Sequence, residues 1–278
     1  MRLPRPPAHW AGLSLDRPRV MGILNVTPDS FSDGGQRMSP QAAIAAGLAM
    51  AKAGADIIDV GGESTRPGAE PVPSDLEMER VLPAIRALSA AGLIVSIDTR
   101  HADTMREAVA AGARIVNDVS ALADDPRSAG VVAELDCPVV LMHRRGDSAT
   151  MNARAVYQDV VAEVRAELSI RIEAAIQAGV RPRQIAIDPG IGFAKQAIHS
   201  VEVLRRLSDL GSLGYPILVG ASRKSFIGRL SGESQADRRL GGSLAAGLFA
   251  VLRGASILRV HDVGDTVQAL KLWKTLFE

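Results

Sequence analysis

The sequence predicts a single-domain α/β protein, a (β/α)8 TIM barrel, and two observations support this prediction. Eight short apolar runs recur along the chain, separated by amphipathic segments of helical length. None of these runs alternates cleanly between apolar and polar residues, which is typical of parallel strands buried on both faces by helices. Eight strand–helix alternations within 278 residues fit a barrel of this class, which usually has about 250 residues.

The eight expected strands are spaced widely enough for a helix and a turn between each pair. In chain order they are RVMGIL (19–24), ADIIDV (55–60), LIVSI (93–97), ARIV (113–116), PVVLM (138–142), IAI (185–187), PILVG (216–220) and SILRV (256–260). An open doubly wound sheet is the alternative that shares this alternation. It is less favoured because no Gly-x-Gly-x-x-Gly turn follows the first run.

The expected helices carry boundary signals of their own. Capping Ser or Asp residues, some followed by proline, satisfy the free N–H groups at a helix start. Such starts are Ser39-Pro40 before 41–53, Ser74 before 75–90 and Asp125-Pro126 before 127–135. Glycines that suit the left-handed position at helix ends are Gly54, Gly92, Gly112 and Gly179. Because no linker interrupts the pattern, we expect one barrel domain over residues 16–278 and an N-terminal extension over residues 1–15.

The charge balance and composition argue against nucleic acid or a membrane as partner. Lys plus Arg number 32 against 31 Asp plus Glu, and aromatic residues make up only 3%. The most apolar helix, 243–252, ends at Arg253, far short of the roughly 20 residues of a membrane span. The N-terminus has no apolar segment typical of a secretory signal. The single Cys137 is expected to be a buried hydrophobe. We therefore expect a soluble, cytoplasmic protein.

Polar and charged residues follow every expected strand. They are Asn25, the segment 61–71, Asp98, Asn117-Asp118, His143, Asp188, the segment 221–228, and Arg259 with His261. Because the carboxyl ends of barrel strands meet at one rim, these groups are expected to converge on one cup. Any one of them alone is more simply explained as a turn former or a helix cap.

Two kinds of chemistry separate within this set. Asp98, Asn117 and Asp188 are suited to reading the edge of a heterocycle, because a carboxylate accepts two parallel N–H bonds. Lys224 offers a donor to a ring carbonyl or ring nitrogen. The second group suits an anion and comprises Asn25, Arg66, Arg223, Arg259 and His261, with Ser222 and Ser225. The alternative for each arginine is a surface side chain that covers its own helix.

These motifs resemble the bacterial dihydropteroate synthase family of the folate pathway. The matching segments are MGILNVTPDSFSDGG, DIIDVGGESTRPGA, VSIDT, IVNDVS, VVLMH, IAIDPGIGF, LVGASRKSFIG and RVHDV, in order from about residue 19 to 265. The resemblance implies that 6-hydroxymethyl-7,8-dihydropterin diphosphate and 4-aminobenzoate give 7,8-dihydropteroate and pyrophosphate. It also implies a homodimer and competition between sulfonamides and 4-aminobenzoate.

The resemblance further implies roles for individual residues. The pterin would be held by Asp98, Asn117, Asp188 and Lys224. The diphosphate would be taken by Asn25 with Mg²⁺, together with Arg259 and His261, and Thr65 adjoins the pterin diphosphate. The aminobenzoate would be framed by Phe31, Thr65, Arg66, Pro67, Phe193 and Ser225. Loops 26–38 and 63–72 would close over both substrates.

The sequence departs from the family's usual pattern in three places, all on one part of the rim. Arg144-Arg145 stand where the family tends to have Met-Gln, Ala194 replaces a usual glycine, and Ser200 replaces a usual asparagine. The role of His143 stays open between structural support and a place behind the site, and Glu63 is expected to fix its loop.

The expected chemistry is loss of diphosphate before attack by the arylamine, because the electron-rich dihydropterin shares positive charge with its methylene carbon. Mg²⁺ and the cations after the last strand would stabilise the leaving group. No residue is expected to form a covalent intermediate. An arylamine is largely unprotonated at pH 7, so no strong base is expected either. Two alternatives remain: a pterin-binding barrel that transfers a methyl group to a corrinoid protein, and an inactive homologue that only binds.

Overall fold

The computed structural model describes residues 8–27, 39–64 and 68–277 of the chain. The barrel strands are β3 (Arg19–Asn25), β4 (Ile57–Gly61), β5 (Val95–Asp98), β6 (Ile115–Asp118), β7 (Val139–Met142), β8 (Ile185–Asp188), β9 (Leu218–Val219) and β10 (Ile257–Val260). All pair in parallel, in the spatial order β8-β7-β6-β5-β4-β3-β10-β9. A parallel bridge between Ile187 and Ile217 joins the two edges. The predicted (β/α)8 barrel is thereby confirmed.

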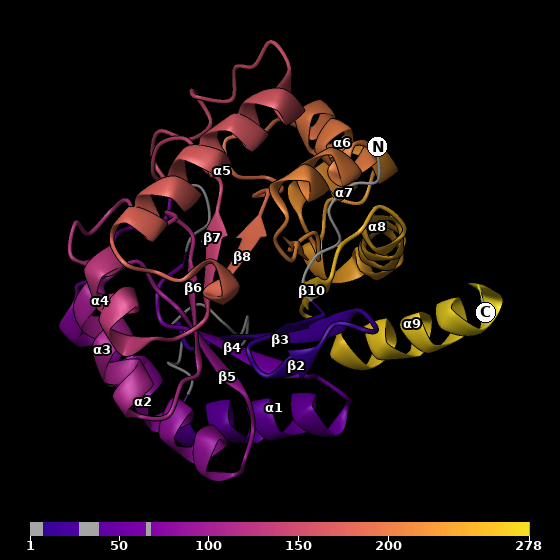
Figure 1. Ribbon diagram of the computed structural model, residues 1–278. Coiled ribbons are helices and arrows are strands. Elements are labelled where there is room, and N and C mark those ends of the chain that lie inside the picture. Colours follow the sequence, from indigo (N-terminus) through magenta and orange to yellow (C-terminus); the bar gives the residue numbers. More distant parts are fainter. Residues whose placement is uncertain (1–7, 28–38, 65–67, 278) are drawn as a thin grey trace.

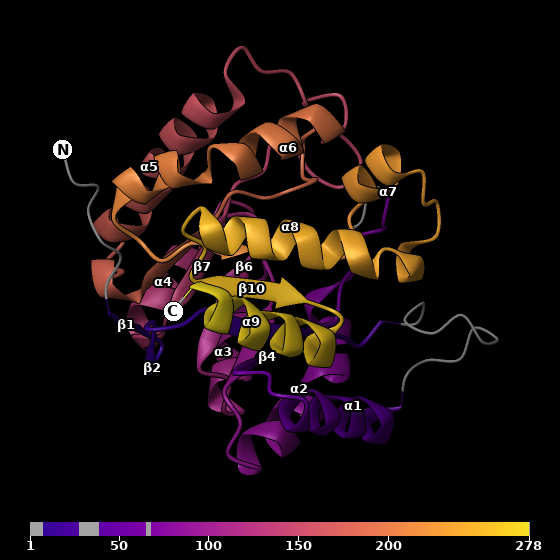
Figure 2. The same cartoon turned by 90° about the vertical axis from the view of Figure 1, so that its right-hand side faces the viewer.

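Helices surround the strands on their outer side (Figure 1). Those in the described residues are α1 (Pro40–Lys52), α2 (Ser74–Ala90), α3 (Ala102–Ala110), α4 (Ser128–Leu135), α5 (Val160–Gln177), α6 (Ala197–Arg205), α7 (Ser225–Ser231), α8 (Leu240–Leu252) and α9 (Val263–Phe277). Short 3-10 turns lie at Pro182–Gln184, Leu207–Leu213 and Ala236–Arg238. Figure 2 shows α8 and α9 on either side of β10. None of the helices in the described part of the chain is long and apolar enough to cross a membrane.

The helix boundaries follow the sequence signals in part. Ser39 caps α1, because its hydroxyl accepts a hydrogen bond from the Ala42 N–H at 3.1 Å. Ser74 is instead the first residue of α2 and makes no capping bond. Asp125 lies two residues before Arg127, the N-cap position of α4; its carboxylate accepts bonds from the N–H groups of Ala102 and Arg127. The glycines expected at helix ends all have positive φ: Gly54, Gly92, Gly112 and Gly179.

A short antiparallel hairpin closes the amino-terminal end of the barrel. It consists of β1 (His9–Trp10) and β2 (Leu13–Ser14). The Trp10 side chain is 2% exposed, and its indole N–H donates to the Gln184 carbonyl at 2.8 Å. The ring packs with the inward-facing side chains Met21, Ile57, Ile115, Val140, Ala186, Leu218 and Ile257. Residues 9–14, within the expected extension, therefore fill the barrel floor and leave the opposite end for a site.

Candidate active site

The carboxyl ends of neighbouring strands place the predicted polar residues side by side. Asn25, the last residue of β3, is paired with Gly61 at the end of β4, and Gly61 is paired with Asp98 of β5. Asp98 is in turn paired with Asn117 of β6. Asp188 ends β8 in register with Met142 of β7. The parallel register thus gathers these side chains at one end of the barrel, as the sequence predicts.

Arg259 links this layer across the barrel. Its Nε donates to Asp59 Oδ2 at 2.6 Å, and its Nη2 donates to Asp98 Oδ2 at 2.6 Å. The Asn117 amide N–H also donates to Asp59 Oδ2, at 3.0 Å. Burial raises the pKa of Asp98 to about 7, while the adjacent Arg259 guanidinium lowers it. The carboxylates and the guanidinium therefore hold one another in place before any substrate binds.

Asp59 is a site residue that the sequence analysis missed. Its side chain is fully buried, and its second carboxylate oxygen has no hydrogen-bond partner within the described ranges. It was overlooked because it lies inside the strand and not at its end. The available signal was a charged residue in an apolar run, since a buried charge is rare unless it is paired.

Asp188 begins the loop between β8 and α6, where the backbone itself fixes the carboxylate. Its Oδ1 accepts a hydrogen bond from the Gly190 N–H at 2.7 Å. Gly190 has φ +67°, and a Cβ there would lie 1.9 Å from the His143 carbonyl oxygen, so only glycine fits. Burial raises the pKa of Asp188, and the Gly190 N–H and the charge on Lys224 lower it. The carboxylate is thus preorganised for a donor pair.

The loops after β9 and β10 bring Ser222 and His261 together. Ser222 Oγ lies 3.0 Å from His261 Nδ1 and accepts the backbone N–H of His261 at 3.2 Å. Ser222 therefore holds the ring on its Nδ1 side and leaves Nε2 for another partner. Burial and the charges on Arg223 and Arg259 lower the pKa of His261 to about 4. The imidazole is therefore neutral at pH 7, whereas the sequence predicts a cation at this position.

Arg223, which the sequence predicts to bind an anion, is paired with a carboxylate instead. Its guanidinium forms an ion pair with the Asp262 carboxylate, with Nε 3.1 Å from Oδ2. Its φ of +58° places it in the left-handed region at the turn before α7. Arg223 thus joins the loops after β9 and β10, and Lys224 and Ser225 follow it at the start of α7.

Lys224 and Phe193 meet at the mouth of the cup although they come from different loops. The Lys224 ammonium lies 4.0 Å from the centre of the Phe193 ring. The Phe193 N–H donates to the Gly190 carbonyl at 3.0 Å, which ties the ring to the loop that carries Asp188. The structure therefore places the expected pterin residue and aminobenzoate residue side by side.

Four expected residues lie outside the described residues: Phe31, Thr65, Arg66 and Pro67. The flanks of the second loop are described. Glu63 accepts hydrogen bonds from Arg100 Nε and from the Val72 N–H, each at 2.9 Å. The bond from Val72 joins the two ends of segment 63–72, which agrees with the loop-fixing role expected for Glu63.

The three departures from the usual family pattern have separate structural settings. Arg144 pairs with Asp124, and Arg145 pairs with Glu163 and Glu167. Ala194 has φ +46°, a left-handed conformation that a glycine would adopt without strain. The Ser200 hydroxyl is buried and has no hydrogen-bond partner among the residues described.

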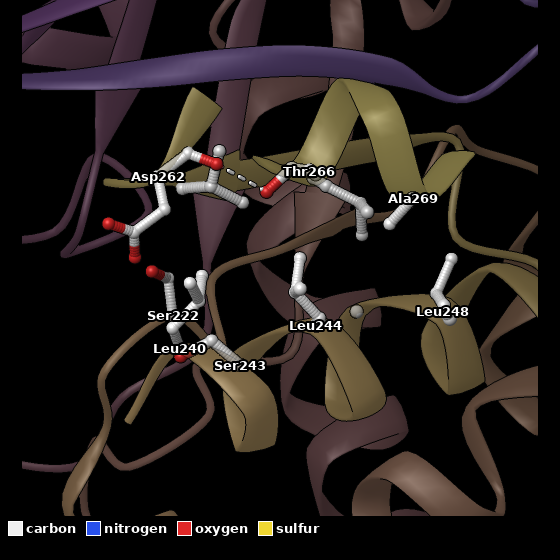
Figure 3. A pocket seen from close by; sticks show the side chains of 11 residues that line it. Ser222, Leu240, Ser243, Leu244, Leu248, Asp262, Thr266 and Ala269 are labelled. Carbon is white, nitrogen blue, oxygen red and sulfur yellow. Dashed lines mark hydrogen bonds between the residues drawn. The ribbon is translucent and has the colours of Figure 1, made fainter. Parts of the chain in front are cut away.

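A cavity of about 10 Å³ lies between α8 and α9, beside Ser222 (Figure 3). Leu244 and Leu248 of α8 face Thr266 and Ala269 of α9 across it. Such a volume holds no more than about one water molecule. It is a packing gap behind the site and too small for a heterocyclic substrate.

Comparison with known proteins identifies the class of enzyme. Residues 21–261 match the family described as pterin binding enzyme. Dihydropteroate synthase of Neisseria meningitidis serogroup C is 45% identical over 267 residues, covering 95% of this chain and 94% of the relative. The Xanthomonas albilineans dihydropteroate synthase structure with 4-aminobenzoic acid has a TM-score of 0.90 at 50% identity and covers 99% of each chain.

A second structure from Xanthomonas albilineans is a complex with 7,8-dihydropteroate. It has a TM-score of 0.87 at 48% identity and covers 95% of each chain. Together with the matched family, these relatives show that the chain belongs to the dihydropteroate synthases, transferases of folate biosynthesis. The expectation drawn from the motifs is thereby confirmed, and transfer of a methyl group to a corrinoid protein is not supported.

Proposed function

We propose that this dihydropteroate synthase condenses 6-hydroxymethyl-7,8-dihydropterin diphosphate with 4-aminobenzoate by losing diphosphate before the amine attacks. The observation that supports this most is the buried polar layer of Asp98, Asn117 and Asp188 on the same rim as Arg259 and His261. Buried carboxylates beside a dihydropterin favour positive charge on its ring. Cleavage of the carbon–oxygen bond at the methylene is then assisted without a covalent intermediate.

The pterin is assigned to the acceptors of the inner layer and to Lys224. Asp188 offers a carboxylate that its own loop orients, so it suits the parallel N–H donors of an aminopyrimidine edge. Asn117 donates to Asp59 with its amide nitrogen, which directs its amide oxygen elsewhere for a ligand N–H. Lys224 supplies a donor for the ring carbonyl or a ring nitrogen, and Thr65 is expected at the edge of the pterin diphosphate.

The diphosphate is assigned to Asn25, Arg259 and His261, with Mg²⁺. No group of three His, Cys, Asp or Glu side chains able to hold a metal occurs among the described residues. Mg²⁺ commonly binds one or two protein oxygens plus substrate phosphates, so a sparse protein contribution fits it. Asn25 Oδ1 and Asp98 Oδ2 both lie within 4 Å of the Cβ that Gly61 lacks, which leaves room beside these oxygens. Bound there, Mg²⁺ would act as a Lewis acid on phosphoryl oxygens.

The chain's own residues then stabilise and release the leaving group. Arg259 is held by Asp59 and Asp98, so its charge needs no reorganisation when diphosphate departs. His261 is held by Ser222 on its Nδ1 side, so an N–H on Nε2 would donate a hydrogen bond to a phosphoryl oxygen. A positive charge that develops on the pterin is balanced by the buried carboxylates.

The aminobenzoate is assigned to Phe193 and Ser225, with Phe31, Thr65, Arg66 and Pro67 as further expected contacts. Phe193 offers an aromatic face at the mouth of the cup beside Lys224. The arylamine is largely unprotonated at pH 7, so it attacks without a strong base and then releases a proton to water. Holding the amine close to the methylene carbon lowers the barrier, by about 7–11 kcal/mol in well-oriented systems.

Product analysis with both substrates and Mg²⁺ tests the proposal. Formation of dihydropteroate together with pyrophosphate supports it, whereas pterin binding without any product would indicate an inactive homologue. Deuterium at the reacting methylene tests the order of events. Loss of diphosphate first predicts a normal secondary isotope effect on kcat/KM, and an effect near unity would contradict it.

We assign the expected homodimer to the outer face of α8 and α9. Leu252 of α8 is 52% exposed and Leu272 of α9 is 62% exposed, so apolar surface is left on two adjacent helices. Leu252→Glu should shift sedimentation from dimer to monomer. Leu48→Glu, at an exposed leucine on α1, is the matched control and should leave the dimer intact. Equal behaviour of the two variants would contradict the assignment.

The cytoplasm is the proposed location. Cys137 is a free, buried cysteine, and burial raises the pKa of its thiol to about 11. An inert thiol without a disulfide partner suits a reducing compartment. Fractionation of cells that express the tagged protein would test the location, and recovery outside the cytoplasm would contradict it.

A further inference from the structure

The proposed mechanism makes no use of Lys195, although this lysine is buried beside the site. It is the last residue of the motif PGIGFAK in the loop between β8 and α6 and is only 8% exposed. Its ammonium nitrogen lies 3.1 Å from the Phe193 carbonyl oxygen and 2.8 Å from His143 Nδ1. Lysine is almost never buried without such partners. These two contacts therefore compensate the cost of burying the Lys195 side chain.

The carboxylate of Glu167 determines which atoms donate in the hydrogen bonds between His143 and Lys195. His143 Nε2 lies 3.0 Å from Glu167 Oε2, and the hydrogen bond from His143 together with Arg145 lowers the pKa of Glu167 to about 2. An ionised carboxylate can only accept, so the His143 proton resides on Nε2. Nδ1 must then accept from Lys195. Burial lowers the pKa of His143 to about 4, which agrees with a neutral ring.

This chain of hydrogen bonds ends at the aminobenzoate side of the cup. Lys195 donates to the carbonyl of Phe193, whose ring lies beneath Lys224. Ala194, between the two, is held at φ +46°, so the backbone cannot relax freely around the Phe193 carbonyl. The His143 carbonyl closes the other side of the loop against Gly190. The position of the ring is thus linked to the position of the Lys195 ammonium.

We propose that Lys195 is a positioning residue of the aminobenzoate site, which holds the Phe193 backbone against His143 and so sets the place of the Phe193 ring beside Lys224. The inference rests on the proposed assignment of Phe193 to aminobenzoate. It does not require Lys195 to touch either substrate.

The charge state of Lys195 adds a pH dependence to this role. Burial lowers its pKa to about 7, and the charges on Arg145 and Lys224 act in the same direction. Asp188 and Glu167 oppose them. The ammonium form prevails below pH 7 and is the stronger donor to a carbonyl. The KM for aminobenzoate should therefore rise as the pH increases through 7, and this rise should vanish when the lysine is replaced.

Steady-state kinetics of Lys195→Met and Lys195→Gln test the proposal, with the exposed Lys271→Met as matched control. Lys195→Met should raise the KM for 4-aminobenzoate by about tenfold, while kcat and the KM for the pterin diphosphate change by less than about threefold. Lys195→Gln keeps a neutral N–H donor, which is weaker than the ammonium group, and should recover only part of the loss. Lys271→Met should behave as the wild type.

A double-mutant cycle with Phe193→Ala separates positioning from general support of the fold. If Lys195 acts through Phe193, Lys195→Met should change the KM for aminobenzoate by less than about twofold in the Phe193→Ala background. A full tenfold effect in that background, equal changes for both substrates, or an unchanged pH profile would overturn the proposal. Thermal melting identifies any variant that fails to fold. If Lys195→Met fails to fold, the same double-mutant cycle with Lys195→Gln and Phe193→Ala tests the proposal.

The wild type and Lys271→Met serve as reporters of the function itself. If both form product and only the Lys195 variants give the wrong pattern, the positioning role is wrong and the synthase assignment stands. If neither forms product from the two substrates, the proposed function fails and the inference fails with it.

Discussion

Arg259 Nη2 donates to Asp98 Oδ2 at 2.6 Å, and this bond joins the end of β10 to the end of β5 across the mouth of the barrel. The same guanidinium also contacts Asp59 on β4. A pterin that reaches Asp98 must therefore share this carboxylate with Arg259. The relationship couples the pterin group to the anion group of the site, which the sequence alone had treated as separate.

Asp59→Asn should disable this coupling. The amide keeps the shape but removes the charge of one of the two buried carboxylates that orient Arg259. Removing a partner from a buried pair costs about 3–5 kcal/mol, and a loss of kcat/KM for the pterin diphosphate of at least about 100-fold is expected. The exposed Asp16, which pairs with Arg19, offers a matched control as Asp16→Asn. Near-normal turnover by Asp59→Asn would show that Arg259 does not need this carboxylate.

Asp188→Ala should weaken pterin binding by about 5- to 150-fold or more. The variant leaves ligand N–H donors without an acceptor, which costs about 1–3 kcal/mol or more for a buried group. Calorimetric titration with a pterin measures the effect directly, and Asp209→Ala, at a surface carboxylate that pairs with Arg206, is the control. Unchanged affinity in Asp188→Ala would show that the pterin does not bind at the end of β8.

Binding of pyrophosphate should be accompanied by proton uptake at His261. Without a bound anion, burial holds the pKa of the His261 side chain at about 4, and an adjacent anion raises this pKa. Between pH 4 and the higher pKa of the complex, the bound state therefore holds more protons than the free state, so the contribution of His261 to affinity grows as the pH falls. Calorimetry at pH 5.5 in buffers of different ionisation enthalpy should detect more protons taken up by the wild type than by His261→Gln. Equal proton uptake by the wild type and His261→Gln would show that pyrophosphate does not bind beside His261.

Trp10→Ala should destabilise the barrel without altering the site. The ring fills the amino-terminal floor, and removal of a buried aromatic side chain costs about 3–5 kcal/mol. Urea unfolding should show this loss, whereas the KM values of the folded variant should stay within about twofold of the wild type. His9→Ala, at the exposed neighbour, should be nearly neutral. An equally small effect at Trp10 would mean that the hairpin does not contribute to the core.

The candidate site could be predicted from the sequence where its residues end strands. Apolar runs without alternation indicated parallel strands, and parallel strands have their carboxyl ends at one rim. Asn25, Asp98 and Asn117 were expected there, and the register places them in one row with Gly61. Local pattern suffices for this, because strand direction and period decide which end a terminal side chain occupies.

The pairing of side chains could not be predicted in this way. Asp59 and Arg259 are 200 residues apart, and His143 and Lys195 are 52 apart. Each lies in a motif that was noticed, but only the closed barrel brings the partners within hydrogen-bond distance. The same holds for Trp10, whose partner Gln184 lies 174 residues away and turns an apparent extension into the barrel floor.

The sequence by itself determined the order of strands and helices and which polar residues face the common rim, because both follow from the spacing of apolar residues along the chain. The tertiary structure alone decided which of those polar residues pair and how burial changes their protonation. Arg223 is held by Asp262 and His261 is neutral for that reason. Contact and desolvation depend on residues distant in sequence, and no local pattern records them.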